Sequence, residues 1–181
     1  LVNDVFMTTP IGSIADPWTV ESLGKGNVYV ESVNSGDIDD RNSLKVDDPF
    51  TIDNSVITYD FEPQTKKLTM ETKFIVKPKS NNYFIGLSSN GKKAIGITAN
   101  KNNFYTTNGQ EVYTKYLDNF WYYLQIDANV ETQTADIYIN YRKVAEGVPF
   151  ENDVQYIDAY HVETGLKQKS TFWIDDIMVY Q

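Results

Sequence analysis

Tyrosine is the residue type in this sequence whose number and placement best fit chemistry with a ligand, since the 181 residues include 13 tyrosines and three tryptophans. Flat aromatic faces stack against the C–H surfaces of pyranose sugars, while neighbouring amides, carboxylates and cations hydrogen-bond the hydroxyl and acid groups. The tyrosines that we expect on outward positions or in loops are Tyr83, Tyr105, Tyr113, Tyr123, Tyr138, Tyr141 and Tyr160. They predict sugar recognition, although β-sheets favour tyrosine in any case and each ring could serve packing alone.

Arg142 and His161 complete the set of residues that we predict to bind carbohydrate. A guanidinium group binds planar acids through two parallel hydrogen bonds, so Arg142 could pair with a uronate or pyruvate carboxylate. A surface ion pair with an acidic neighbour is the alternative role. If Arg142 lines the binding groove, an acidic polysaccharide becomes the better ligand.

Strands must position these side chains, because short segments of period-2 alternation, rich in β-branched and aromatic residues, recur along the chain. The predicted strands span residues 27–33, 43–47, 55–61, 67–76, 83–88, 93–99, 103–106, 111–116, 121–129, 135–141, 155–164 and 171–180. Asn90-Gly91 and Asn108-Gly109 predict tight hairpins. The sequence therefore predicts an all-β fold, a single antiparallel two-sheet β-sandwich of jelly-roll type over residues 1–181, with an up-and-down barrel as the alternative.

Alternation also assigns side chains to the two faces of a sheet. In the segment 121–129, Tyr122, Leu124, Ile126 and Ala128 form the apolar set, which leaves Tyr123 and its alternating partners to face solvent or a ligand. In the segment 135–141, Ala135, Ile137 and Ile139 are the expected core residues, and Asp136, Tyr138 and Asn140 point the other way. Tyr123 and Tyr138 should therefore lie on outer surfaces, and these could be one surface.

The last predicted strand breaks this alternation at Asp175-Asp176. Strict period 2 would bury Asp175 together with Ile177 and expose Ile174, whereas a β-bulge at the pair would return Ile174 to the core. Because bulges often lie beside functional sites, these carboxylates could hold a metal ion. Hydrogen bonding to loop amides is the alternative.

Acidic side chains are dense in two parts of the sequence. One part is Asp37, Asp39, Asp40 and Asn42, and the other comprises Asp4, Asp47, Asp48, Asp175 and Asp176. Carboxylate oxygens are the ligands that calcium prefers, although the spacing lacks the central glycine and terminal glutamate of an EF-hand. In a chain with a formal net charge of −9, such a loop could equally be a solvated turn.

Composition excludes several other classes of function. Twenty-five acidic residues against 16 basic ones, and arginine only at positions 41 and 142, do not suit a nucleic-acid or anionic-membrane partner. No apolar run approaches the ~20 residues of a spanning helix. The absence of cysteine excludes thiol nucleophiles and Cys-type metal sites. Leu1 reads as a mature or excised boundary, with no signal peptide in view.

The order of motifs resembles the concanavalin A-like, or laminin-G-like, jelly-roll accessory domains of secreted bacterial polysaccharide lyases and glycoside hydrolases. The matching stretches are Asn3-Asp4-Val5-Phe6, Pro17-Trp18-Thr19-Val20, Asn42-Ser43-Leu44-Lys45-Val46-Asp47-Asp48, Asn82-Tyr83-Phe84-Ile85-Gly86-Leu87, Phe120-Trp121-Tyr122-Tyr123-Leu124-Gln125-Ile126, Asp136-Ile137-Tyr138-Ile139-Asn140 and Trp173-Ile174-Asp175-Asp176-Ile177. Together they cover nearly the whole chain.

This resemblance implies an extracellular location and glycan binding. It also implies a calcium ion that ties the start of the fold to the last strand, which makes Asp4, Asp175 and Asp176 candidate ligands beside Asp37 and Asp39. One departure concerns the turn after Asn140, where such domains often have Asn-Gly and this chain has Tyr141-Arg142. The bulky aromatic and the cation could belong to a ligand site.

Catalysis is the competing class. Endo-glucanases of the same superfold carry Glu-x-Asp-x-x-Glu on one strand, which this sequence lacks, since Glu71 and Glu163 have no acidic partner at that offset. A polysaccharide lyase needs a Tyr or His base and a group that neutralises the uronate, which Tyr160, His161 and Arg142 could supply. His161 is the only histidine, and the other lyase signatures are missing.

We therefore expect a monomeric, non-catalytic carbohydrate-binding module that holds a parent catalytic domain of a secreted enzyme against a plant or microbial polysaccharide. The expected partners are the polysaccharide and that catalytic domain, with calcium as a structural cofactor and no nucleic-acid or membrane partner. A small jelly-roll lyase or hydrolase and a surface adhesion domain that binds protein are the alternatives.

Overall fold

The computed structural model describes residues 1–14, 16–22, 26–33, 41–50, 52–77 and 80–181, and every regular element within them is a β-strand. The strands are β1 (Val2–Asp4), β2 (Trp18–Ser22), β3 (Asn27–Val33), β4 (Arg41–Asp48), β5 (Val56–Gln64), β6 (Lys67–Val76), β7 (Phe84–Ser89), β8 (Lys92–Asn100), β9 (Asn103–Thr106), β10 (Glu111–Tyr113), β11 (Trp121–Asn129), β12 (Thr134–Ile139), β13 (Arg142–Pro149), β14 (Ile157–Glu163) and β15 (Ser170–Tyr180). No helix among the described residues is long and apolar enough to cross a membrane.

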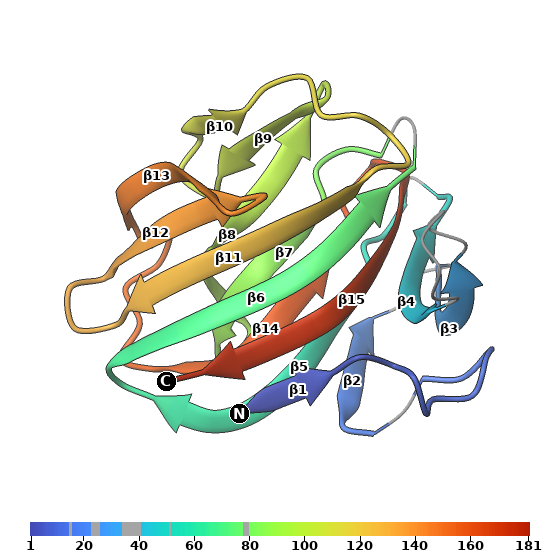
Figure 1. The fold of residues 1–181 in the computed structure, drawn as a ribbon, viewed down its shortest axis with the longest axis horizontal. Coiled ribbons are helices and arrows are strands. Elements are labelled where there is room, and N and C mark those ends of the chain that lie inside the picture. Colours follow the sequence, from blue (N-terminus) through green and yellow to red (C-terminus); the bar gives the residue numbers. More distant parts are fainter. Residues whose placement is uncertain (15, 23–25, 34–40, 51, 78–79) are drawn as a thin grey trace.

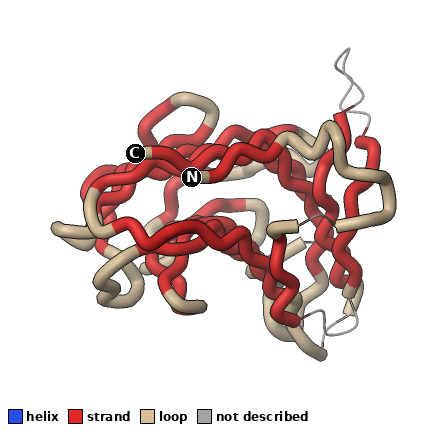
Figure 2. The backbone as a smooth tube through the Cα atoms, turned by 90° about the horizontal axis from the view of Figure 1, so that it is seen from below, coloured by secondary structure: helices blue, strands red, loops and turns tan. Residues whose placement is uncertain are grey.

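The strands form two antiparallel sheets that pack face to face (Figures 1 and 2). Sheet I has the order β13-β12-β11-β6-β15-β4-β3, with β1 also paired to β15, and sheet II has the order β10-β9-β8-β7-β14-β5-β2. The chain crosses between the sheets repeatedly, so that β6 lies between β11 and β15 rather than beside its neighbours in sequence. The predicted jelly-roll sandwich is confirmed, and the up-and-down barrel is excluded.

Both predicted hairpins are present. Asn90 and Gly91 join β7 to β8 with positive φ angles of 47° and 75°, and the segment 107–110 joins β9 to β10. The sequence prediction missed β1, β2 and β13. The first two are short strands of three and five residues, and the alternation in β13 is interrupted by register shifts against β12.

The core lies between the inner faces of the two sheets. Tyr122, Leu124, Ile126 and Ala128 of β11 are all buried there, and Ala135, Ile137 and Ile139 of β12 join them. The alternate residues of both strands are half-exposed on the outer face. The face assignment from alternation is therefore confirmed for these two strands.

Strand β15 carries the predicted bulge at Asp175-Asp176. Asp175 lies opposite Lys73 of β6, but the next partner pair is Met178 with Glu71, so β15 has one residue more than β6 in this interval. Asp176 has a φ of 47°, and Ile174 and Ile177 on either side of the pair are both fully buried. The extra residue thus restores the core side of the strand.

On the outer face of sheet II, a phenylalanine ring packs directly against the backbone of two glycines. The ring of Phe84 lies across Gly86 and Gly96, which face each other on β7 and β8. A Cβ built on Gly96 would lie 2.4 Å from a ring carbon of Phe84 and 2.6 Å from the carbonyl oxygen of Ile85. Only glycine therefore fits beneath this ring.

The substitution Gly96→Ala should lower the free energy of unfolding by about 1–3 kcal/mol, because the added methyl group forces the ring and the adjacent strand apart. Chemical denaturation monitored by fluorescence measures this change. Thr98→Ala on the same strand is the control and should cost less than about 1 kcal/mol. Equal losses in the two variants would show that the contact has no special role.

Candidate functional site

Two tyrosine rings stack on the outer face of sheet I. Strand β11 places Tyr123 on that face, and the turn between β12 and β13 places Tyr141 against it, with 4.3 Å between ring centroids and 22° between ring planes. Tyr141 is 75% exposed. The pair therefore offers a flat aromatic surface to solvent.

The turn that carries Tyr141 has positive φ angles at both of its residues. Asn140 and Tyr141 have φ angles of 50° and 65°, values at which two-residue hairpins usually place Asn-Gly. Asn140 anchors the turn to β11, since its amide donates to the carbonyl of Tyr123 at 2.9 Å and its Oδ1 accepts from the amide of Tyr123 at 3.0 Å. Tyrosine in place of glycine costs stability at this φ, and the side chain that it gains in exchange stands on the outer face.

A depression of about 310 Å³ lies beside the tyrosine pair, over strands β6, β11 and β15. We call it the tyrosine depression, and its lining residues are Val5, Glu71, Lys73, Tyr123, Tyr141, Asp176 and Met178. Lys73 Nζ lies 2.6 Å from Asp176 Oδ2, so the bulge in β15 brings an aspartate to this lysine. The wall of the tyrosine depression therefore combines apolar side chains with an ion pair.

Glu71 organises the hydrogen bonds of the tyrosine depression. The hydroxyl of Tyr180 donates to Glu71 Oε1 at 2.6 Å, and this bond raises the pKa of Tyr180 to about 12. Burial, followed by the charge of Glu71, raises the pKa of Tyr123 as well. A tyrosine is protonated at neutral pH in any case, so both hydroxyl groups are hydrogen-bond donors here.

Tyr138 lies on the same outer face, because it pairs in register with Gln125 of β11. Lys143 Nζ lies 5.7 Å above the Tyr138 ring and 2.8 Å from Asp136 Oδ2. The hydrogen bond from Lys143, followed by the one from the amide of Gly147, lowers the pKa of Asp136. The expectation that Tyr123 and Tyr138 share one surface is confirmed.

Tyr83 and Tyr160 are fully buried, so their predicted outward placement is wrong. The Tyr83 ring packs 5.2 Å from Phe172, and the Tyr160 ring meets Trp18 edge-on at 5.9 Å. Residues 159–162 of β14 are all buried, so both faces of this strand are covered. Alternation of polar and apolar residues therefore could not indicate which of its side chains point into the core.

The other predicted tyrosines lie away from the tyrosine depression. Tyr105 is on β9 of sheet II, where its hydroxyl donates to Glu111 at 3.1 Å. Tyr113 packs against the core ring of Phe104 at 5.8 Å. The structure therefore brings together Tyr123, Tyr138 and Tyr141 out of the predicted tyrosines.

His161 is 2% exposed and lies on the opposite face of β14 from Tyr160. Its ring meets Phe84 edge-on at 5.3 Å, and its Nε2 lies 3.4 Å from Glu163 Oε2. Lys93 Nζ is 2.9 Å from the same carboxylate oxygen. Burial alone would raise the pKa of Glu163, but the contacts with His161 and Lys93 lower it to about 2.

Arg142 is exposed at the start of β13 and lines a separate hollow of about 450 Å³, together with Glu111, Tyr113 and Lys143. Tyr160 lies in the core, His161 on sheet II and Arg142 on sheet I. The three residues that the lyase alternative requires are therefore not brought together.

The described acidic residues proposed as calcium ligands have protein partners. Asp4 accepts from the amide of Phe6 at 3.0 Å and from the indole of Trp18 at 2.8 Å. Asp175 is buried and accepts from the Ser43 hydroxyl at 3.2 Å.

Asp176 pairs with Lys73, and Asp37 and Asp39 lie outside the described residues. Among the described residues, no group of three or more His, Cys, Asp and Glu side chains could hold a metal ion. Because Asp37 and Asp39 lie outside the described residues, the calcium prediction stays a prediction.

Sequence reasoning missed Glu71, Lys73 and Met178. Alternation in β6 was available as a signal, since it places Lys67, Thr69, Glu71 and Lys73 on one face. No local pattern could show that the outer face of β6 lies between those of β11 and β15, because the paired residues are 46 to 111 positions apart in the sequence.

No protein-family model matches the chain, and no curated protein matches it. Solved structures do share its fold. A structure described as a sialidase has a TM-score of 0.79 at 15% identity, over 99% of this chain and 18% of the sialidase. A carbohydrate esterase from Shiga toxin-encoding bacteriophage phi24B has a TM-score of 0.69 at 16% identity, over 98% of this chain and 96% of the esterase.

The carbohydrate-binding module CBM66 from Bacillus subtilis has a TM-score of 0.57 at 16% identity, over 95% of this chain and 100% of the module. At these identities the likeness establishes the jelly-roll fold. This chain spans about 18% of the length of the sialidase.

Tyr141→Gly and Tyr141→Ala both remove the ring, but only glycine adopts the observed φ without strain. We expect Tyr141→Gly to be more stable than Tyr141→Ala by about 1 kcal/mol. Tyr138→Gly and Tyr138→Ala are the control pair, in which glycine should be the less stable by about 0.5–1 kcal/mol because Tyr138 lies within a strand. Urea denaturation of the four variants tests this reversal, and the same sign at both positions would contradict it.

Because the fold lowers the pKa of Glu163, it favours the ionised form of this group. The resulting stability is fully present above the ordinary glutamate pKa near 4.5 and is lost as the pH falls towards 2. Between pH 5 and pH 2, the free energy of unfolding should fall more in the wild type than in Glu163→Gln, by at most about 3 kcal/mol. Guanidinium denaturation across this range measures the difference, and parallel pH profiles would refute the assignment.

Proposed function

We propose that this chain is a non-catalytic carbohydrate-binding module that binds a polysaccharide on the outer face of sheet I. The observation that carries this proposal is the exposed ring of Tyr141, which stacks on Tyr123 beside the tyrosine depression. A sugar ring can stack on such a surface while its hydroxyl groups bond to Glu71 and to the phenols around it.

The cost of the Tyr141 backbone supports a functional role for this ring. A glycine would close the same turn without strain, and the stacking on Tyr123 lies at the surface rather than in the core. A position that departs from the best local choice is typical of a functional site.

Two features of the fold neighbours support the same proposal. CBM66 is described as a carbohydrate-binding module, and the sialidase contains this fold as a small part of a longer chain. We propose that this chain likewise serves a parent enzyme that degrades polysaccharide outside the cell, and that it acts as a monomer. The separation of Tyr160, His161 and Arg142 argues against the lyase alternative.

A surface adhesion domain that binds protein is the second candidate. Five large apolar side chains are exposed on three loops, namely Phe50, Ile52, Leu117, Phe120 and Leu166. All three loops lie at the same end of sheet I. Phe50 and Ile52 follow the end of β4, which pairs with the start of β15. The other two loops lead into β11 and β15, and both of these strands begin opposite the end of β6. Exposed apolar patches mark protein interaction sites.

Affinity electrophoresis in gels that contain neutral or acidic polysaccharides tests the binding proposal. We expect at least one polysaccharide to retard the wild type, and Tyr141→Gly to weaken that binding by about tenfold, which corresponds to about 1.4 kcal/mol. Tyr105→Ala removes a partly exposed ring from sheet II and should bind like the wild type.

Undiminished retardation of Tyr141→Gly would refute this site, and no retardation by any polysaccharide would favour the adhesion domain. A parallel assay of reducing ends and of absorbance at about 235 nm tests catalysis on the same substrates. New unsaturated products would make the protein a lyase.

A further inference from the structure

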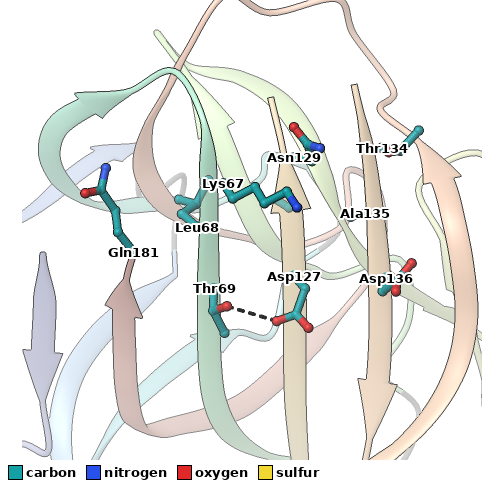
Figure 3. A pocket seen from close by; sticks show the side chains of 10 residues that line it. Lys67, Leu68, Thr69, Asp127, Asn129, Thr134, Ala135, Asp136 and Gln181 are labelled. Atoms are coloured by element: carbon teal, nitrogen blue, oxygen red, sulfur yellow. Dashed lines mark hydrogen bonds between the residues drawn. The ribbon is translucent and has the colours of Figure 1, made fainter. Parts of the chain in front are cut away.

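A third hollow, of about 440 Å³, lies on the outer face of sheet I (Figure 3). We call it the polar hollow, and its lining residues are Lys67, Leu68, Thr69, Asp127, Ala128, Asn129, Thr134, Ala135, Asp136 and Gln181. Three neighbouring strands, β6, β11 and β12, supply all of them except Gln181. Neither the stacked tyrosines nor Arg142 belongs to it.

The polar hollow and the tyrosine depression lie on the same two strands. Along β11 and β6, the outward residues pair in register as Tyr123 with Lys73, Gln125 with Glu71, Asp127 with Thr69, and Asn129 with Lys67. Asn129 lies six positions after Tyr123, a distance of roughly 20 Å along a strand. The two hollows therefore occupy opposite ends of one path along β6 and β11.

Hydrogen bonds connect the side chains along this path. Gln125 Nε2 donates to Asp127 Oδ1 at 2.9 Å, and the hydroxyl of Thr69 donates to the same oxygen at 3.0 Å. The hydroxyl of Tyr123 lies 3.4 Å from Gln125 Oε1. These bonds hold polar groups in fixed positions between the two hollows, which lowers the entropy cost of binding a ligand to them.

The polar hollow presents both donors and acceptors. The Lys67 side chain reaches from β6 towards β11, where Asp127 and Asn129 lie (Figure 3). Asn129 Oδ1 accepts from the backbone amides of Glu131 and Thr132, so its side-chain NH₂ is the group left to donate outward. A hydroxyl-rich ligand suits this combination, because each sugar hydroxyl can both donate and accept.

Charge restricts the class of ligand. The carboxylates that line the two hollows are Glu71, Asp127, Asp136 and Asp176, against the lysines Lys67 and Lys73 and the Lys143 that pairs with Asp136, which leaves one negative charge in excess. A polyanion would therefore meet net repulsion here, in a protein whose formal charge is already −9.

We propose that the polar hollow is a second subsite for the same polysaccharide, and that an internal segment of a linear, uncharged glycan lies along β6 and β11. This inference rests on the proposed function. One part of the glycan stacks on the exposed face of the Tyr141 ring, and a part several sugars further along bonds to Lys67, Asp127 and Asn129. A single sugar ring is too short to reach both.

The test uses oligosaccharides of two to six units, prepared from the uncharged polysaccharide that retards the wild type most strongly, and isothermal titration calorimetry. We expect the affinity of the wild type to rise at least about tenfold from the disaccharide to the hexasaccharide. Asp127→Ala and Lys67→Ala should each lower the affinity for the hexasaccharide by about five- to tenfold and leave that for the disaccharide unchanged.

Tyr141→Gly should weaken binding at every length, and Asp60→Ala, which removes an exposed acid from sheet II, should change nothing. Affinity that stops rising at the disaccharide, or that survives both polar-hollow substitutions, overturns the second subsite while the proposed function stands. Preference for an acidic over an uncharged polysaccharide overturns the ligand class. Absence of binding to every polysaccharide overturns the proposed function itself, and the second subsite with it.

Discussion

The pairing register of β6 with β11 on one side and with β15 on the other is the constraint on which both faces of sheet I depend. Because side chains alternate along a strand, a shift of one residue in either pairing would exchange the inner and outer sets. The observed register buries Met70 and Phe74 in the core and sets Glu71 and Lys73 beside Tyr123. One arrangement of hydrogen bonds therefore determines both the stability of the core and the chemistry of the surface.

The bulge in β15 shows how the fold reconciles these two demands. Two consecutive aspartates interrupt an apolar strand, and without an extra residue either Ile174 or Ile177 would leave the core. The bulge keeps both isoleucines inside, with Asp175 buried against Ser43 and Asp176 directed to Lys73. A local irregularity of the backbone thus supplies a charged group to the outer face without loss of apolar burial.

Alternation made much of this architecture predictable. It gave the fold class, the buried sets of β11 and β12, the bulge, and the shared outer face of Tyr123 and Tyr138. It failed where alternation was absent, as in β14, which is buried on both faces and hides Tyr160 and His161 alike. It could not supply Glu71 or the polar hollow, because these depend on strand neighbours that are distant in sequence.

The turn at Tyr141 separates what the protein needs to fold from what it displays. Asn140 holds the turn between β12 and β13 against β11, whereas the side chain of Tyr141 is largely exposed to water and contributes little to the core. A residue in such a position can be replaced by another residue while the protein stays folded. Related chains could therefore change their ligand preference at this one position while the scaffold stays constant, which makes the turn a natural point of divergence in evolution and of entry for protein engineering.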